Sequence, residues 1–227
     1  MGMLGKTQGV CINHYVPDYT VFDLETTGIS CSCDQIIEIS AVKVRSGAVV
    51  DSFSCLVNPG RPIPYRASQV NHITDEMVAD EPGLAQVLPE FLRFAGDDTL
   101  VGHNIGGFDM KFLYRDCQRF WSLYPGNDYV DTLKLARVLL SGLPNYRLTT
   151  LAEHYGLSTH GAHRALKDCQ MNQQIFELLG KEESRSPVRD TGVCPKCGMA
   201  LKKRMGKFGP FLGCTGYPSC RYTRDFR

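Results

Sequence analysis

Apolar and polar residues alternate in three early stretches of the chain, at residues 19–24, 36–44 and 49–57. The alternation and the β-branched residues in it predict strands, and the TTG and RSG turns between them predict an antiparallel meander. From residue 74 the period changes, because apolar side chains then recur at helical spacing over residues 84–95 until Gly96 ends the run. The pattern predicts a sheet first and helices after it.

The remaining pattern up to residue 180 mixes short apolar runs with helical spacing. The short runs at residues 99–101 and 129–130 predict buried strands. Helical spacing predicts a helix after Gly107 and further helices at residues 132–140, 148–155 and 162–179. Strands followed by mixed elements predict an α/β fold, in which helices pack on the faces of a mixed sheet. The 227 residues, 43% of them hydrophobic, can form one substantial core and a small appendage.

Residues 181–192 separate two parts of unlike charge. The KEESRSPVRDT run has almost no apolar residues and contains a proline, which predicts a linker between a domain at 1–180, with its core at 18–180, and a module at 193–227. The net charge of +1 hides a split. Residues 1–180 carry 14 basic and 20 acidic side chains, whereas residues 181–227 carry 11 and 4. The basic module is typical of a polyanion-binding segment, and nucleic acid is the commonest such partner.

Acidic residues from distant segments indicate metal chemistry in the larger domain. Asp23 and Glu25 in VFDLETTG alternate on one predicted strand, so their side chains share a face while Phe22 and Leu24 face the core. Asp109 stands near the start of a predicted helix, where a lone acid is also explained by the helix dipole. Gathering such carboxylates is costly unless divalent cations neutralise them.

A later segment, HRALKDC, adds His163 and Asp168. Residues five apart on a regular helix lie roughly 140° apart, so His163 must lie at or just before the helix start if both serve one site. A lone histidine is more often structural than catalytic. Before Asp109, the polar pair His103 and Asn104 and two glycines indicate close approach of the backbone to another molecule, for which a substrate is one candidate.

Four of the ten cysteines have the spacing of a metal site. Cys194 and Cys197 form a CxxC pair, and Cys214 and Cys220 follow after sixteen residues. Two close pairs can supply four thiolates to one structural Zn²⁺. The module has too little apolar material to fold by packing alone, so we expect the metal to stabilise it. Disulfides or free thiols are the alternative. Cys31 and Cys33, which have no second pair, are interpreted as loop residues.

Together, the motifs DLETTG, HNIGGFD and HRALKD resemble those of the DEDDh 3′ to 5′ exonucleases over residues 18–180. This family has a ribonuclease H-like fold and includes proofreading exonucleases of bacterial replicative polymerases. The resemblance implies two Mg²⁺ or Mn²⁺ ions, with His163 as the base that accepts the proton of the attacking water. The implied metal ligands are Asp23, Glu25, Asp109 and Asp168.

The resemblance also implies a substrate. The enzyme would remove 5′-mononucleotides from the 3′ end of single-stranded or frayed DNA, and a DNA polymerase is a candidate partner. The candidate substrate contacts in this domain lie next to the first and second motifs, at Thr26, Gly28, His103 and Asn104.

The CPKCG, GKFGPFLGC and YPSC stretches of residues 193–222 resemble the four-cysteine zinc ribbon of bacterial type IA topoisomerases. In that family the module binds single-stranded DNA, which implies that cations meet phosphates here while aromatic rings stack on bases. Some of these rings are alternatively the small core of the module. The candidate contacts are Lys202, Lys203, Arg204, Lys207, Arg221, Phe208, Phe211 and Tyr217.

Two alternatives stay open. One is an exoribonuclease of the same superfamily, whose metal site would be identical. The other is a non-catalytic nucleic-acid adaptor, which binds through the zinc ribbon and docks a partner through the larger domain. No apolar run approaches the roughly 18 residues of a membrane span, and the first residues lack the pattern of a signal peptide. We therefore expect a cytoplasmic protein.

Overall fold

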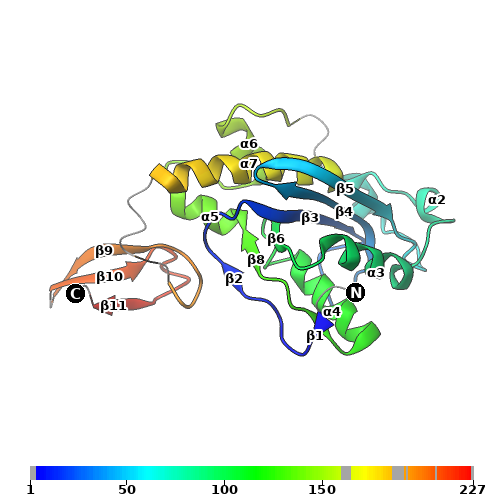
Figure 1. The fold of residues 1–227 in the computed structure, drawn as a ribbon, viewed down its shortest axis with the longest axis horizontal. Helices are drawn as coiled ribbons and strands as arrows, with labels where there is room; N and C mark the ends of the chain where they lie inside the picture. The colour runs from blue at the N-terminus through cyan, green and yellow to red at the C-terminus, as the bar shows by residue number, and fades with distance from the viewer. Residues whose placement is uncertain (1–3, 160–164, 186–191, 193, 208, 226–227) are drawn as a thin grey trace.

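The computed structural model describes residues 4–159, 165–185, 192, 194–207 and 209–225. At its centre is a six-stranded mixed sheet in the order β2-β8-β6-β3-β4-β5 (Figure 1). The antiparallel meander is confirmed in β3, β4 and β5, while β6, β8 and β2 continue the sheet in parallel pairs. The strands are β2 (Cys11–Ile12), β3 (Asp18–Thr26), β4 (Ile36–Arg45), β5 (Ala48–Leu56), β6 (Thr99–Gly102) and β8 (Tyr129–Asp131).

Helices cover both faces of this sheet (Figure 1). One face packs against α3 (Leu84–Ala95) and α4 (Asp109–Trp121). The other face packs against α5 (Thr132–Leu139), α6 (Leu148–His154) and α7 (Ala165–Arg185). The smaller elements are β1 (Leu4–Gly5), β7 (Tyr124–Pro125), α1 (Tyr65–Asn71) and α2 (Asp75–Val78). In the part of the chain that the structure describes, no helix is both long and apolar enough to cross a membrane.

The central strand β3 divides its side chains between the two layers, as the sequence pattern predicts. Phe22 and Leu24 belong to the core beneath α3 and α4, whereas Tyr19 and Val21 belong to the core beneath α5, α6 and α7. Asp23 and Glu25 continue the second face toward the end of the strand. The face under α7 therefore changes from apolar to acidic along β3, and the acidic end of the strand is where the candidate site lies.

One predicted boundary is wrong. The last helix of the domain, α7, continues to Arg185, so residues 181–185 are helical and are not the start of a linker. Lysine, glutamate and arginine are good helix formers, and a polar composition does not end a helix that is already anchored by packing. Residues 186–191 lie outside the described residues.

The C-terminal module is a three-stranded antiparallel sheet in the order β11-β10-β9, at the left of Figure 1. Its strands are β9 (Leu201–Gly206), β10 (Gly209–Cys214) and β11 (Thr223–Asp225). The core of the module consists of Cys194, Leu201, Leu212 and Cys214, with the other two cysteines packed against it. So small an apolar cluster supports the expectation that a metal contributes to folding.

Candidate active site and zinc site

Three of the predicted ligands converge at the end of β3. One carboxylate oxygen each from Asp23, Glu25 and Asp168 lies within 4.8 Å of the other two. The two acids of β3 reach one point because they alternate on a strand, and Asp168 reaches it from the first turn of α7. The packing of α7 across β3 and β4 thus brings together residues from the two ends of the domain.

Asp109 stands beside this group as the first residue of α4. Its side chain is buried, and its Oδ1 accepts a hydrogen bond from the backbone N–H of Leu24 at 3.2 Å. Burial raises the pKa of Asp109 to about 7, although this hydrogen bond opposes the rise. The interaction ties the fourth acid to the strand that carries Asp23 and Glu25.

Burial raises the pKa of Asp23 well above its ordinary range, and neighbouring carboxylates, with Asp109 first, add to the rise. A cluster of carboxylate oxygens without nitrogen or sulfur donors is the ligand set of hard divalent cations. The residues present therefore fit a divalent metal. His163, the predicted base, lies outside the described residues.

A cavity of about 520 Å³ opens next to the acids. Asp23 and Asp168 line it, and so do Arg137 and Arg147, which the sequence analysis missed. Among the described residues, neither arginine has a carboxylate within ion-pairing distance. The cavity thus combines acidic groups that suit a metal with cationic groups that suit a phosphate.

His103 and Asn104 line the same cavity, but they also hold its wall together. The two ring nitrogens of His103 lie 3.1 Å from the Thr132 hydroxyl and 2.9 Å from the Tyr146 carbonyl oxygen. Burial lowers the pKa of His103 to about 4, so the ring is neutral at pH 7. This ring joins β6, α5 and the loop before α6, and it positions the segment that carries Arg147.

Asn104 has a left-handed backbone, with φ 60°. Its N–H donates to Asp131 Oδ1 at 3.1 Å, and the same oxygen caps the start of α5 by accepting from the Leu133 N–H. The sequence analysis missed this role of Asp131. An acid directly before a predicted helix is the signal that could have found it.

The other two predicted contacts lie where β3 ends, since Thr26 is its last residue and Gly28 stands in the turn that follows. The Thr26 hydroxyl donates to the Gly28 carbonyl oxygen at 2.6 Å. A Cβ atom on Gly28 would lie 2.6 Å from the Asp34 carboxylate, so a larger residue would require that carboxylate to shift. The interpretation of Cys31 and Cys33 as loop residues is confirmed, since both lie in a turn between β3 and β4.

Arg115 fastens this turn to α4. Its guanidinium donates to the carbonyl oxygens of Cys31 and Asp34, and it pairs with the fully buried carboxylate of Asp116. Arg119 approaches the same carboxylate from one helical turn further on. The segment after the acidic strand is therefore anchored to the helix that begins with Asp109.

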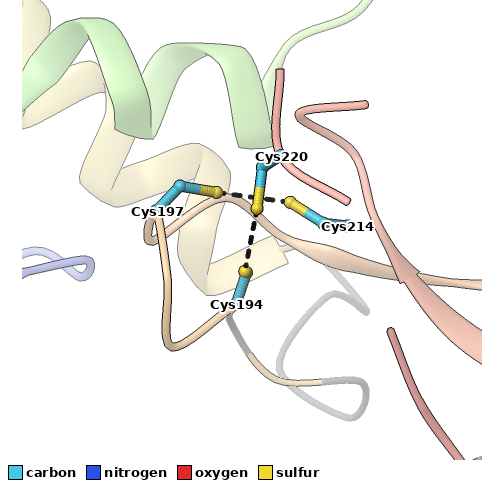
Figure 2. Close-up of side chains that lie close together, drawn as sticks. All are labelled: Cys194, Cys197, Cys214 and Cys220. Carbon is cyan, nitrogen blue, oxygen red and sulfur yellow. Dashed lines mark hydrogen bonds between the residues drawn. The ribbon is translucent and has the colours of Figure 1, made fainter. Parts of the chain in front are cut away.

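The four predicted zinc ligands converge in the C-terminal module (Figure 2). The Sγ atoms of Cys194 and Cys220 are 3.6 Å apart, and those of Cys197 and Cys214 are 3.3 Å apart. Sulfurs at about 2.3 Å from a tetrahedral zinc ion lie about 3.8 Å from one another, whereas a disulfide requires about 2 Å. All four are free cysteines, so the residues fit zinc and not a disulfide pair.

One face of the ribbon carries cations beside aromatic rings. Phe211 on β10 lies directly opposite Arg204 on β9. These residues, with Tyr217 and Arg221, line a groove of about 320 Å³. Phe211 and Tyr217 are outside the core of the module. The candidate cations Lys202, Lys203, Arg204, Lys207 and Arg221 are all exposed. Phe208 lies outside the described residues.

A mixed sheet with half-buried acids at the end of its central strand defines the class of ribonuclease H-like, metal-dependent nucleases. The exonuclease family pattern matches residues 20–176, and that of the topoisomerase DNA-binding C4 zinc finger matches residues 191–227. The epsilon subunit of DNA polymerase III from Aquifex aeolicus is 40% identical over 72% of this chain and 81% of its own length. The chain belongs to the exonuclease family.

Other relatives contain the same domain within a much longer chain. The PolC-type DNA polymerase III of Oceanobacillus iheyensis is 43% identical over 74% of this chain, which spans only 12% of that polymerase. The structure of Exonuclease X in complex with 5′ overhanging duplex DNA is 32% identical, with a TM-score of 0.56, and covers 74% of this chain and 92% of its own. Both predicted resemblances are confirmed.

A further solved structure supports the fold alone. Escherichia coli Exonuclease I in complex with a dT13 oligonucleotide has a TM-score of 0.68 and covers 92% of this chain and 55% of its own, at 17% identity. The predicted ribonuclease H-like architecture is confirmed.

Proposed function

We propose that this protein removes 5′-mononucleotides from the 3′ end of single-stranded or frayed DNA, and that its zinc ribbon holds the strand. The observation that carries the proposal is the convergence of Asp23, Glu25 and Asp168 beside a cavity with two unpaired arginines in its wall, within the described residues. Phosphodiester hydrolysis requires groups that bind the metal and groups that bind the phosphate.

Mg²⁺ or Mn²⁺ is the proposed metal, because the donor atoms that the described residues bring together here are carboxylate oxygens. Asp23, Glu25 and Asp168 would hold it, with Asp109 buried beside them. Bound divalent cations supply Lewis acidity and lower the pKa of water. Our assignment of two ions rests on the family resemblance.

The chain's own residues would orient the substrate and move the proton. Arg137 and Arg147 would bind phosphates of the strand, whose approach to the acids is otherwise opposed by like charge. His103, neutral and hydrogen-bonded at both nitrogens, would fix the wall that carries Arg147. His163 would accept a proton from the attacking water, a role proposed from its place in the HRALKD motif.

The ribbon groove would bind the strand away from the cut. Phe211 and Tyr217 offer faces on which bases of any sequence can stack, while Arg204 and Arg221 meet phosphates. The net positive charge of the C-terminal module then compensates for the net negative charge of the exonuclease domain, which repels DNA. The ten free cysteines suit a reducing compartment, and the cytoplasm remains our proposal for it.

The relatives support DNA as the substrate, since Exonuclease X was solved with duplex DNA that carries a 5′ overhang. The epsilon and PolC relatives are named as parts of DNA polymerase III, which supports a polymerase as a partner. The whole-protein activities of the long PolC chains extend beyond the segment shared with this one.

The test is degradation of matched 5′-labelled DNA and RNA 20-mers, single-stranded and as duplexes with paired or mismatched 3′ ends, with and without Mg²⁺. We expect stepwise shortening from the 3′ end of single-stranded and mismatched DNA, dependent on Mg²⁺. Faster shortening of the RNA would instead favour the exoribonuclease. Binding without any cleavage, by wild-type protein that binds Mn²⁺, would favour the adaptor.

The cationic wall is tested with Arg147→Gln. We expect the KM for single-stranded DNA to rise about tenfold, because a charge-assisted phosphate contact contributes about 1.5–3 kcal/mol. Arg93→Gln, in the last turn of α3, is the matched control. Equal KM values for both variants would remove Arg147 from the substrate site.

A further inference from the structure

A fifth acid, Glu38, lies next to the site and is not used by the mechanism above. Glu38 is on β4 and is 3% exposed. The register of β3 and β4 places it directly opposite Glu25, and places Ser40 opposite Asp23. Side chains of directly opposed residues project from the same face of a sheet, so Glu38 shares the acidic face under α7.

The hydrogen bonds of Glu38 use only one of its oxygens. Oε1 accepts from the hydroxyls of Ser40 and Ser54, both at 3.4 Å, which is long for such a bond. Oε2 is buried and has no hydrogen-bond partner among the described residues. Leaving a buried charged oxygen without a partner is costly, so its presence requires an explanation.

The position opposite Glu25 adds to that cost. Like charges directly opposite each other on neighbouring strands are destabilising, and here both lie near further carboxylates. The charge of Glu38 contributes, after burial and the other acids, to the raised pKa of Asp23. The pairing of β3 and β4 shifts register immediately after Glu25. Such irregularities re-aim side chains next to active sites.

Packing does not explain the residue either. Glu38 interrupts an otherwise apolar and small-residue run, IIEISAV, in a strand that is buried along most of its length. A glutamine would occupy the same volume and could accept the same two serine hydrogen bonds. What only glutamate adds is a negative charge and a second acceptor oxygen.

We propose that Glu38 is a positioning residue of the acidic site, whose Oε2 provides an additional acceptor for a hydrated divalent cation held by Asp23, Glu25 and Asp168. The inference rests on the proposed function and deepens it. Glu38 increases the affinity of the site for the cation, and the cation in turn relieves the repulsion between Glu38 and Glu25.

The experiment compares wild type with Glu38→Gln in the full, zinc-loaded chain. Binding of Mn²⁺ is measured from the electron paramagnetic resonance signal of the free ion, and the melting temperature is measured with and without Mn²⁺. We expect the Kd for Mn²⁺ to rise about tenfold, the lower end of the range for partners of metal ligands. Without Mn²⁺ the variant should melt at a higher temperature than wild type, because one buried like charge is gone.

The matched control is Glu90→Gln, an exposed acid on α3, which covers the opposite face of the sheet. It should leave both the Kd and the melting temperatures unchanged. A purely structural role for Glu38 predicts that Glu38→Gln melts lower than wild type, both with and without Mn²⁺. That result, or an unchanged Kd, would overturn the proposal.

Two further outcomes separate this inference from the function on which it rests. Failure of wild type to bind Mn²⁺ would contradict the proposed function itself. Wild-type binding together with an unchanged Kd in Glu38→Gln would contradict only the role of Glu38. Should Glu38→Gln not fold, Glu38→Asp replaces it. The shorter side chain withdraws the oxygen and should also weaken binding, so wild-type affinity in that variant would equally overturn the proposal.

Discussion

The acidic site and the cysteine site solve the same problem of holding a cation in opposite ways. The carboxylates come from β3, α4 and α7 and meet only when the whole domain is packed. The cysteines come from within residues 194–220 and surround one point with little core of their own. Packing of the exonuclease domain forms the acidic site. In the ribbon the order is reversed, because binding of a metal by the four cysteines stabilises the folded module. Metal should therefore be optional for the structure of the exonuclease domain and required for that of the ribbon.

The largest effect that tests this comparison is expected for Asp168→Asn. We expect it to lower the rate of Mg²⁺-dependent DNA degradation about 10³-fold, because a site for cations loses one of its charged ligands. The zinc content, measured by mass spectrometry, should stay at one ion per chain. Asp51→Asn on the exposed strand β5 is the control. Activity within a few-fold of wild type would exclude Asp168 as a ligand.

The second prediction concerns zinc. Cys214→Ser should release zinc and unfold the ribbon, while the thermal transition of the exonuclease domain stays in place. Affinity for a long single strand, measured by fluorescence anisotropy, should fall about a hundredfold because one of two linked binding units is lost. The turnover at saturating substrate should be preserved. A shared loss of both transitions would show that the two metal sites depend on each other.

The third prediction sharpens the comparison through His103, whose burial is a product of long-range packing. Its pKa is lowered to about 4 in the folded protein and is ordinarily about 6.5 when unfolded. Below pH 6.5 the unfolded chain therefore binds a proton that the folded chain does not. This group should lower the free energy of unfolding by about 2 kcal/mol between pH 7 and pH 5.

Urea denaturation at both pH values measures the effect, with His103→Gln as the variant. The variant should be less stable than wild type at pH 7 by about 1–2 kcal/mol, through its lost hydrogen bonds, and this deficit should shrink at pH 5. A constant deficit would mean that His103 titrates normally.

The smallest predicted effect is on the ribbon surface. Arg204→Gln should weaken single-stranded DNA binding several-fold and reduce the slope of log Kd against log salt by about 0.7, the value for one phosphate contact on a single strand. Lys196→Gln, between the first two cysteines and outside the groove, is the matched control. An unchanged slope for Arg204→Gln would move the DNA path off this face.

The local sequence pattern was sufficient to predict much of the fold and of both metal sites. Strand alternation predicted that Asp23 and Glu25 share a face, and spacing predicted which four cysteines group together. Glu38, Arg137 and Arg147 were missed because their approach to the acids depends on strand register and on the closure of a loop, which composition does not encode. The end of α7 was misplaced because residues 181–185 are polar like a linker yet favour a helix.

The anchoring of the turn after β3 by Arg115 has a consequence for local unfolding around the acidic site. Because that guanidinium joins the turn to α4, and Asp109 joins α4 back to Leu24, neither segment can detach without breaking both links. The strand end and the helix start thus form one unit of local unfolding, and their amide hydrogens should exchange with solvent together. Local unfolding would then displace the carboxylates of the acidic site together. Partly formed sites that hold a cation in the wrong place would be rarely populated.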